Sequence, residues 1–352
     1  MIKPSGILCT TYKQDMRIFF APVHWYALLF FIAILFFVPF YLSPAVLSLV
    51  CYMGIIIIAC HGLNLLTGLC GQISVGQAAF VGVGAYTYGI LVGKLGMPGL
   101  IAIPVSALFT GMVGVIFGLP AARIKGFYLL MSTMAAQFIL VWVFVHARGL
   151  TGGIVYGLSV PEFSIFGILL DSDIKKYFLI MLFVGLMTFI AKNVQRARMG
   201  RAFVAIRDND LAAEVMGINI VLYKFLAFFV CSFFAGIAGS LWAIFVGHLH
   251  PDQFTFMDSI WYVGILVVGG LGTTMGVIFG TFFIKIMDEL VTIYSPAIAG
   301  LLPSMEAGVF AGLGIVVFGL VVLLALIFEP RGINHRWELL KNSFRLHPYS
   351  YH

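Results

Sequence analysis

Apolar runs of about 20 residues recur along most of this chain, and they constrain its fold more than any other feature. Each run is long enough to cross a hydrocarbon layer about 30 Å thick as a helix. Backbone groups in lipid have no water to bind, so runs of this length satisfy their hydrogen bonds internally, as an α-helix does. The sequence therefore predicts an all-α polytopic integral membrane protein, and its 62% content of hydrophobic residues agrees with that class.

We expect about ten transmembrane helices, within a range of eight to ten. Their predicted ranges are 24–42, 45–66, 74–93, 98–119, 127–147, 176–191, 224–247, 258–272, 274–294 and 304–328. The first run is too long for a signal-peptide core, so no cleaved signal is expected. These ranges divide the chain into an N-terminal segment 1–23, a transmembrane domain 24–328 that contains a polar loop 192–223, and a tail 329–352.

The distribution of basic residues predicts the orientation of the chain. Lys and Arg concentrate on the cytoplasmic side of membrane proteins. With an even number of spans, four basic clusters fall on one side: before residue 18, at Arg123 and Lys125, within 192–224, and in the tail from Arg331 onward. Both termini and the polar loop are therefore predicted to be cytoplasmic.

Two glycine-rich segments, Gly62–Gln77 and Val267–Gly276, do not fit plain spans. A glycine-interrupted segment often marks a discontinuous helix that lines a transport pathway; the alternative is a tight cytoplasmic hairpin between ordinary helices. Candidate pathway residues are Asn64, Gln72, Ser74 and Gln77, with Thr133 and Gln137 four residues apart on a neighbouring span. For Thr133, a bond to its own helix backbone explains the residue equally well.

Several kinds of functional site are missing from the sequence pattern. We find no acidic relay within the spans, no phosphate-binding loop, no nucleophile–base pair and no metal-ligand spacing. Lys285 and the nearby acids Asp288 and Glu289 have the spacing of a structural ion pair on one helix face. The five scattered cysteines are typical of packing residues. The chain is therefore expected to be neither an enzyme nor a cofactor or metal carrier, and any energy source must lie in another subunit.

The polar loop is the most charged part of the chain. Only 10% of all residues are charged, yet nine lie between Lys192 and Lys224. Asp208 or Asn209 can cap a short helix, and Gly217 can end it. If residues 203–218 formed one helix, Val204, Leu211, Val215 and Ile218 would share a face beside Arg207, Asp210 and Glu214. Such a helix could lie on lipid, dock into a protein partner or stay solvated; charges of both signs favour a protein partner.

Seven motifs in order resemble the LivM-type permease of branched-chain amino-acid ABC importers, and they cover about residues 45–333. They are NLLTGLCGQISVGQAAFVGVGAY, RIKGFYLLMSTMA, LTGGIVYG, MGRAFVAIRDNDLAAEVMGINIVLYKFLAF, AGIAGSLWA, VVGGLGTTMGVIFG and FEPRGI. The resemblance implies a multi-pass protein of a bacterial-type inner membrane. It also implies a homologous second permease subunit, two cytoplasmic ATPases that bind ATP and Mg²⁺, and an extracytoplasmic binding protein. No nucleic acid is expected as a partner.

The same resemblance assigns roles within the polar loop. It makes Asn209–Gly217 a coupling helix that sits in a groove of the ATPase, with Arg207, Asp210 and Glu214 as contacts, Asp208 and Asn209 as caps and Gly217 as the stop. Related permeases carry urea or short amides, so those solutes and other amino acids stay open as cargo. An alternative of another class is a secondary transporter or channel that works without ATPases.

Overall fold

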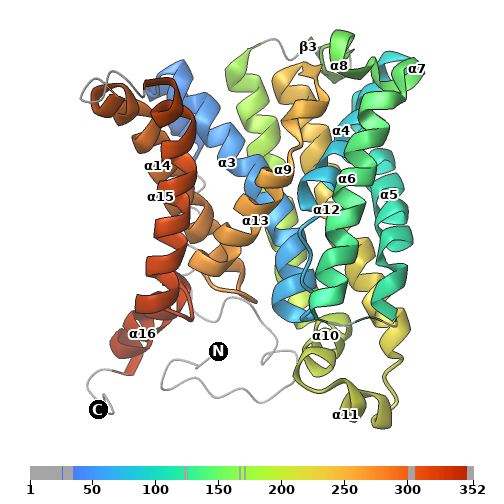
Figure 1. The fold of residues 1–352 in the computed structure, drawn as a ribbon, viewed down its shortest axis with the longest axis vertical. Helices are drawn as coiled ribbons and strands as arrows, with labels where there is room; N and C mark the ends of the chain where they lie inside the picture. Colours follow the sequence, from blue (N-terminus) through green and yellow to red (C-terminus); the bar gives the residue numbers. More distant parts are fainter. Residues whose placement is uncertain are drawn as a thin grey trace.

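The computed structural model is a bundle of helices that stand side by side (Figure 1). It describes residues 26, 35–122, 124, 126–165, 168–169, 172–299 and 306–346. The longer helices are α3 (Pro44–Leu63), α4 (Gln77–Gly93), α5 (Gly99–Gly118), α6 (Phe127–His146), α9 (Asp173–Arg196), α12 (Ile220–Val246), α13 (Phe256–Gly269), α14 (Thr274–Ala299) and α15 (Glu306–Phe328). The shorter helices are the π-helix η1 (Asn64–Leu69), η2 (Leu119–Ala122), α7 (Arg148–Thr151), α8 (Gly153–Tyr156), α10 (Arg198–Asp208), α11 (Asp210–Val215), η3 (Pro251–Gln253) and α16 (Ile333–Leu346).

Helix α12 forms the centre of the packed core, against α3, α4 and α5. Small residues allow this close packing. A Cβ atom added at Gly84 would lie 2.5 Å from the Cα of Gly236, and one added at Gly239 would lie 2.0 Å from the carbonyl oxygen of Val81. Lipid gives no hydrophobic drive for helices to associate, so such close backbone approach is a main source of packing energy. On the other side, α13 packs against α14, which packs against α15.

Most of the predicted spans coincide with helices, but the predicted number of ten is not confirmed. Five described helices are long and apolar enough to cross a membrane, or up to seven if each of two bent pairs is one span. Helix α4 has only 17 residues, and α13 and α14 meet at a bend of 116°. The predicted span 24–42 lies largely outside the described residues.

Short strands are a small exception to the all-α class. Residues Leu158–Ser159 (β1) pair antiparallel with His248–Leu249 (β4), and Ser164–Ile165 (β2) pair with Ile168–Leu169 (β3). Strand β3 lies with α7 and α8 at the end of the bundle opposite α10 and α11 (Figure 1). These two-residue pairs tie loop segments together, so the prediction of an all-α membrane protein holds.

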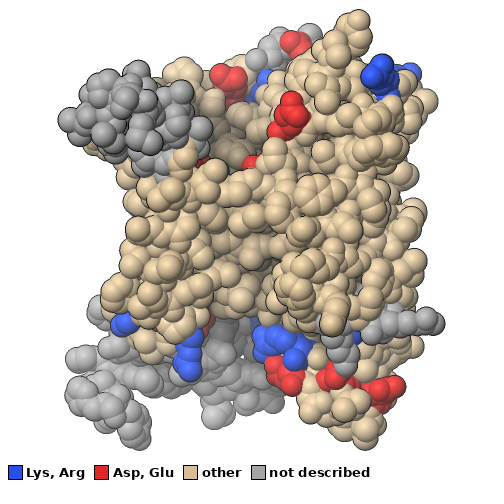
Figure 2. All heavy atoms as spheres, viewed as in Figure 1, with Lys and Arg blue, Asp and Glu red and all other residues tan. Residues whose placement is uncertain are grey.

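Charged side chains gather at the two ends of the molecule and leave an almost uncharged band between them (Figure 2). Helices α10, α11 and α16 share one end (Figure 1), which brings the basic residues of the polar loop to the same side as those of the tail. This agrees with the orientation predicted from charge for two of the four clusters. The N-terminal cluster, Arg123 and Lys125 lie outside the described residues, so the placement of both termini in the cytoplasm stays a prediction, as do the segment boundaries at residues 23 and 328.

Candidate functional site

The predicted coupling helix Asn209–Gly217 corresponds to α11 (Asp210–Val215), and a separate helix, α10, precedes it. Helix α10 ends at Asp208, and Asn209 has an extended backbone (φ −159°, ψ 108°) before α11 begins. The Asn209 Oδ1 accepts a hydrogen bond from the backbone N–H of Ala212 at 3.1 Å, as a helix N-cap does. Residues 203–218 are therefore not one continuous helix, because the cap residue leaves the helical conformation, and the shared face that a single helix would give does not apply. Asn209 as cap is confirmed.

The structure does not support the predicted role of Asp208 as a helix cap, but it supports that of Gly217 as the end of the helix. Asp208 is the last residue of α10, and its Oδ1 accepts hydrogen bonds from Nε and Nη2 of Arg207 at 3.0 and 2.8 Å, so it does not cap α11. Gly217 adopts φ +83°, which glycine tolerates best, and its N–H donates to the Glu214 carbonyl at 2.9 Å. Gly217 thus ends this helical segment as predicted.

Helix α11 exposes apolar side chains at the end of the bundle that it shares with α10 and α16. Leu211, Val215 and Met216 are 70%, 88% and 82% exposed, whereas Ala213 is buried against the rest of the chain. Glu214 is exposed beside them and Asp210 is half-buried. The sequence indicated Leu211 and Val215 as part of a shared face, but it gave no reason to add Met216, which follows the last helical residue. We call Leu211, Val215 and Met216 the apolar tip.

Arg207 points back toward the bundle. Its Nη1 donates to the carbonyl oxygen of Gly68, in the π-helix η1, at 3.0 Å. A Cβ atom added at Gly71 would lie 2.8 Å from the Cγ of Arg207, so the aliphatic stem packs against that turn. A residue predicted to contact a partner is therefore hydrogen-bonded within its own chain.

The two glycine-rich segments both interrupt helices, and they meet. A Cβ atom added at Gly68 would lie 2.4 Å from the backbone nitrogen of Gly272, and one added at Gly332 would lie 2.4 Å from the Cα of Gly270. Three separate segments thus touch through glycine backbone, and a larger residue at Gly68 or Gly332 would clash. We call Gly68, Gly270, Gly272 and Gly332 the glycine junction.

The side chain of Asn64 stabilises the glycine junction through two hydrogen bonds. Its Oδ1 accepts from the N–H of Gly272 at 2.7 Å, and its Nδ2 donates to the carbonyl of Thr273 at 3.2 Å. The side chain is 1% exposed. Asn64 lies in η1, and π-helical turns often mark functional positions. One amide side chain therefore joins the end of α3 to the break between α13 and α14.

The other candidate pathway residues are also buried within the bundle. Gln77 donates from Nε2 to the Ala59 carbonyl at 2.8 Å and accepts from the Cys231 thiol at 3.2 Å. Thr133 donates to the Leu130 carbonyl in its own helix at 2.9 Å, as its residue type indicated. It also accepts from the N–H of Val75 at 3.2 Å.

Gln72 and Ser74 lie in the non-helical segment between η1 and α4. The Nε2 of Gln72 donates to the Cys70 carbonyl at 3.4 Å, whereas its buried Oε1 has no hydrogen-bond partner among the described residues. The hydroxyl of Ser74 accepts from the N–H of Gly76 at 3.5 Å. Both hydrogen bonds join residues only two positions apart in the chain, and both have long donor–acceptor distances.

Gln137 has the most extensive set of hydrogen bonds. Its Oε1 accepts from the N–H of Ala79 at 2.9 Å and from the Ser259 hydroxyl at 3.0 Å, and its Nε2 donates to the Phe254 carbonyl at 3.0 Å. The Ser259 hydroxyl in turn accepts from the N–H of Ala78 at 2.9 Å. Helix α4 starts inside the bundle without a cap of its own, and α6 and α13 thus supply acceptors for its first amides.

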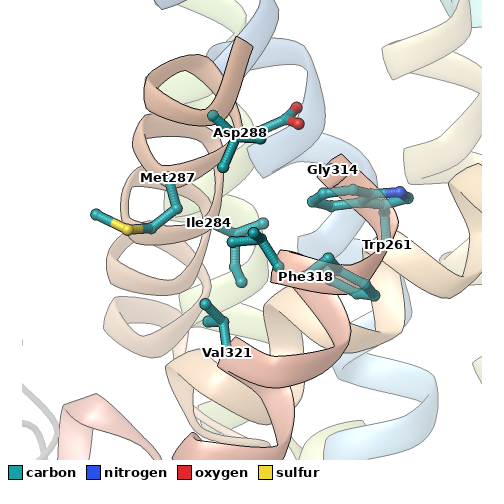
Figure 3. Close-up of a pocket in the computed structure, with 9 residues that line it drawn as sticks. Trp261, Ile284, Met287, Asp288, Gly314, Phe318 and Val321 are labelled. Carbon is teal, nitrogen blue, oxygen red and sulfur yellow. The ribbon is translucent and has the colours of Figure 1, made fainter. Parts of the chain in front are cut away.

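Two small pockets lie elsewhere, and neither is lined by any of the six candidate pathway residues. One, among α13, α14 and α15, has a volume of about 10 Å³ and includes Trp261, Ile284, Asp288 and Phe318 (Figure 3). Asp288 there pairs with Lys285 at 3.0 Å, which confirms the predicted ion pair. The second pocket, of about 30 Å³, has a lining that sequence reasoning missed: Tyr52, Ile55, Ala78, Val81, Trp242, Gln253, Phe254, Asp258 and Tyr262.

Comparison with known proteins agrees with the resemblance seen in the motifs. The family model "Branched-chain amino acid transport system / permease component" matches residues 45–326. The chain is 29% identical over 276 residues to the high-affinity branched-chain amino acid transport system permease protein LivM of Escherichia coli (strain K12). That alignment covers 72% of this chain but only 65% of the relative, so the chain spans less than two thirds of the length of that relative.

Two proteins of Methanocaldococcus jannaschii are also similar. The chain is 25% identical over 238 residues to the probable branched-chain amino acid transport permease protein LivM, covering 66% of this chain and 67% of that one. It is 24% identical over 302 residues to the probable permease protein LivH, covering 82% of this chain and 92% of the relative. The family match covers most of the chain, and the expected likeness to LivM-type permeases is confirmed. This chain belongs to the family of branched-chain amino acid transport system permease components.

Proposed function

We propose that this chain is the membrane-spanning permease subunit of an ATP-driven, binding-protein-dependent importer of branched-chain amino acids (leucine, isoleucine and valine). Two cytoplasmic ATPases bind ATP and Mg²⁺, and their movement switches the permease between outward-open and inward-open states. A homologous second permease subunit completes the pathway, and an extracytoplasmic binding protein delivers the cargo. The chain itself carries no catalytic step and binds no cofactor, and it resides in a bacterial-type inner membrane.

The apolar tip of α11 is the single observation that best supports this proposal. Two large apolar side chains on this short helix, and a third directly after it, leave substantial apolar surface exposed at one end of the bundle. A short amphipathic helix of this kind fits a groove on a protein partner. Asp210 and Glu214 would add charged contacts around the apolar centre, as at other protein interfaces. Family membership then makes an ATPase subunit the expected occupant.

Labelled leucine uptake, at low external concentration, tests the function in cells with and without the gene. We expect uptake to fall in the deletion and to be competed by excess isoleucine or valine in the parent. If uptake is unchanged in a strain without other leucine carriers, the branched-chain cargo is rejected. Urea, short amides and other amino acids are then tested in the same cells.

A charge reversal in α11 tests the coupling role. We expect Asp210→Lys with Glu214→Lys to insert normally into the membrane and to lose co-purification of the ATPases, because both carboxylates change sign at the proposed interface. Glu338→Lys, in the exposed face of α16, is the control and should keep the ATPases bound. Unchanged co-purification in the double variant would refute this role for α11.

A secondary transporter or channel makes a different prediction. Such a protein would move its solute in liposomes that contain the purified chain alone and a solute gradient. The importer proposed here needs its ATPases, so we expect no uptake under those conditions and ATP-dependent uptake once the whole complex is reconstituted.

A further inference from the structure

We propose that Arg207 is a positioning residue that links movement of the α11 docking helix to the glycine junction. This inference rests on the proposed function, and it replaces the ATPase contact that the resemblance implied for Arg207. The side chain would act inside the permease, as a strut, and would not contact the ATPase. Its place between the docking helix and two interrupted helices is the basis of the proposal.

The hydrogen bonds of the guanidinium group point to this role. Each of its three nitrogens donates to an acceptor within the chain: Nη1 to the Gly68 carbonyl at 3.0 Å, and Nε and Nη2 to Asp208 Oδ1 at 3.0 and 2.8 Å. The planar fork fixes the angle between these acceptors, which a lysine could not do. Asp208 immediately precedes the cap of α11, so a shift of α11 moves the carboxylate to which the guanidinium group is hydrogen-bonded.

From Gly68 the connection continues through short, stiff contacts. Gly68 belongs to the same π-helix as Asn64, whose side chain holds Gly272 and Thr273 in the break between α13 and α14. The backbone at Gly68 has no room for even one added carbon atom, and Gly272 adopts φ +80°, a conformation that favours glycine. A Cβ atom added at Gly272 would also lie 3.9 Å from Arg207 Nη1, so the guanidinium group borders both breaks.

This arrangement explains how a cytoplasmic helix could act on the pathway. Coupling needs a physical element whose position both ends bias. When the ATPases displace α11, the Asp208–Arg207 pair pulls on the Gly68 carbonyl, and Asn64 carries that displacement to the α13–α14 break. The helices on either side of the breaks then change angle at glycines, where the backbone is most easily rotated. Arg207 and Asn64 would be successive links of this connection.

The test uses the full importer complex with Arg207→Met, which keeps the aliphatic stem and removes the hydrogen-bond donors. We expect the ATPases to co-purify as with the parent chain and to hydrolyse ATP at a similar rate, while leucine transported per ATP falls by about tenfold. Asn64→Ala should uncouple the complex in the same way. Arg201→Met is the control, because Arg201 is exposed on α10 and donates to the Arg196 carbonyl; it should transport normally.

The results of these experiments distinguish failure of the Arg207 proposal from failure of the proposed function. If Arg207→Met transports as well per ATP as Arg201→Met, the strut is refuted. If Arg207→Met loses the ATPases, Arg207 is a docking contact and the strut is again refuted. If the parent chain never associates with ATPases, the proposed function itself has failed.

A distance measurement needs no Arg207 variant. In the parent complex with Cys9 replaced by Ser, spin labels at Arg198→Cys and Leu271→Cys report on α10 and on the α13–α14 break, and both positions are exposed. If the strut holds these parts together, the label-to-label distance stays the same with and without ATP. A nucleotide-dependent change in that distance would overturn the proposal.

Discussion

At the scale of single residues, the polar side chains inside the bundle mostly bond to its own backbone. Gln137, Gln77 and Asn64 each bond to at least two groups from distant parts of the chain. Buried polar groups cost free energy unless they are paired, so these contacts hold particular helices together. Polarity within a span therefore indicates a structural role here as readily as a transport pathway.

A stability measurement distinguishes the two roles for Gln137. Gln137→Leu would leave the Ala79 N–H, the Ser259 hydroxyl and the Phe254 carbonyl without this partner, so we expect a loss of about 2–4 kcal/mol in the free energy of unfolding in detergent. Gln72→Leu is the matched control, because its Oε1 is already unpaired among the described residues. It should cost less than about 1 kcal/mol. Normal stability with lost uptake in Gln137→Leu would instead favour a pathway role.

At the scale of elements, α11 depends on its cap more than a long helix does. A helix of six residues has few internal hydrogen bonds, and the bond from Ala212 N–H to Asn209 Oδ1 satisfies one of its free amides. The same type of cap, Asn219, begins the 27-residue helix α12. The two asparagines therefore allow a matched comparison.

Removing each cap should have different effects on ATPase binding. We expect Asn209→Ala to cost about 1 kcal/mol of local helix stability, and hence to weaken ATPase association about fivefold. Asn219→Ala should leave association unchanged, because packing holds α12 in place. ATPase retention by purified complexes over a salt or detergent titration measures the difference, and equal effects of the two substitutions would contradict the role given to the cap.

At the scale of the whole molecule, the uncharged band between two charged ends predicts how the chain sits in the membrane (Figure 2). Met216 lies in the apolar tip at one end, and Tyr156 lies in α8 at the other (Figure 1). Among the described helices that are long and apolar enough to cross a membrane, only α9 separates these residues along the chain. They should therefore face opposite sides of the membrane.

Cysteine accessibility tests this orientation. We expect an impermeant maleimide to label Tyr156→Cys in intact spheroplasts and Met216→Cys only after the membrane is opened. Tyr156 and Met216 are 80% and 82% exposed, and the four described native cysteines are buried, so the unsubstituted chain serves as the background control. Labelling of Met216→Cys from outside would reverse the predicted topology.

The class of the fold and the local features of the coupling segment follow from the amino-acid sequence alone. Long apolar runs impose helices in a membrane because the backbone must pair with itself. Asn209 and Gly217 act through bonds to groups three residues away, so the sequence indicated the helix end at Gly217 and narrowed the cap to Asp208 or Asn209. The positions of the two glycine-rich breaks were likewise visible.

The contacts that these residues make, in contrast, depend on how the helices pack in three dimensions. Asn64 and Gly272 are 208 residues apart, Arg207 and Gly68 are 139 apart, and Gln137 and Ser259 are 122 apart. A buried polar group takes whichever donor or acceptor the packing leaves unpaired, and that depends on how separate helices come together. For this reason the sequence placed Arg207 among the partner contacts and the glutamines in a pathway, whereas in the folded chain each of them forms hydrogen bonds with other residues of the same chain.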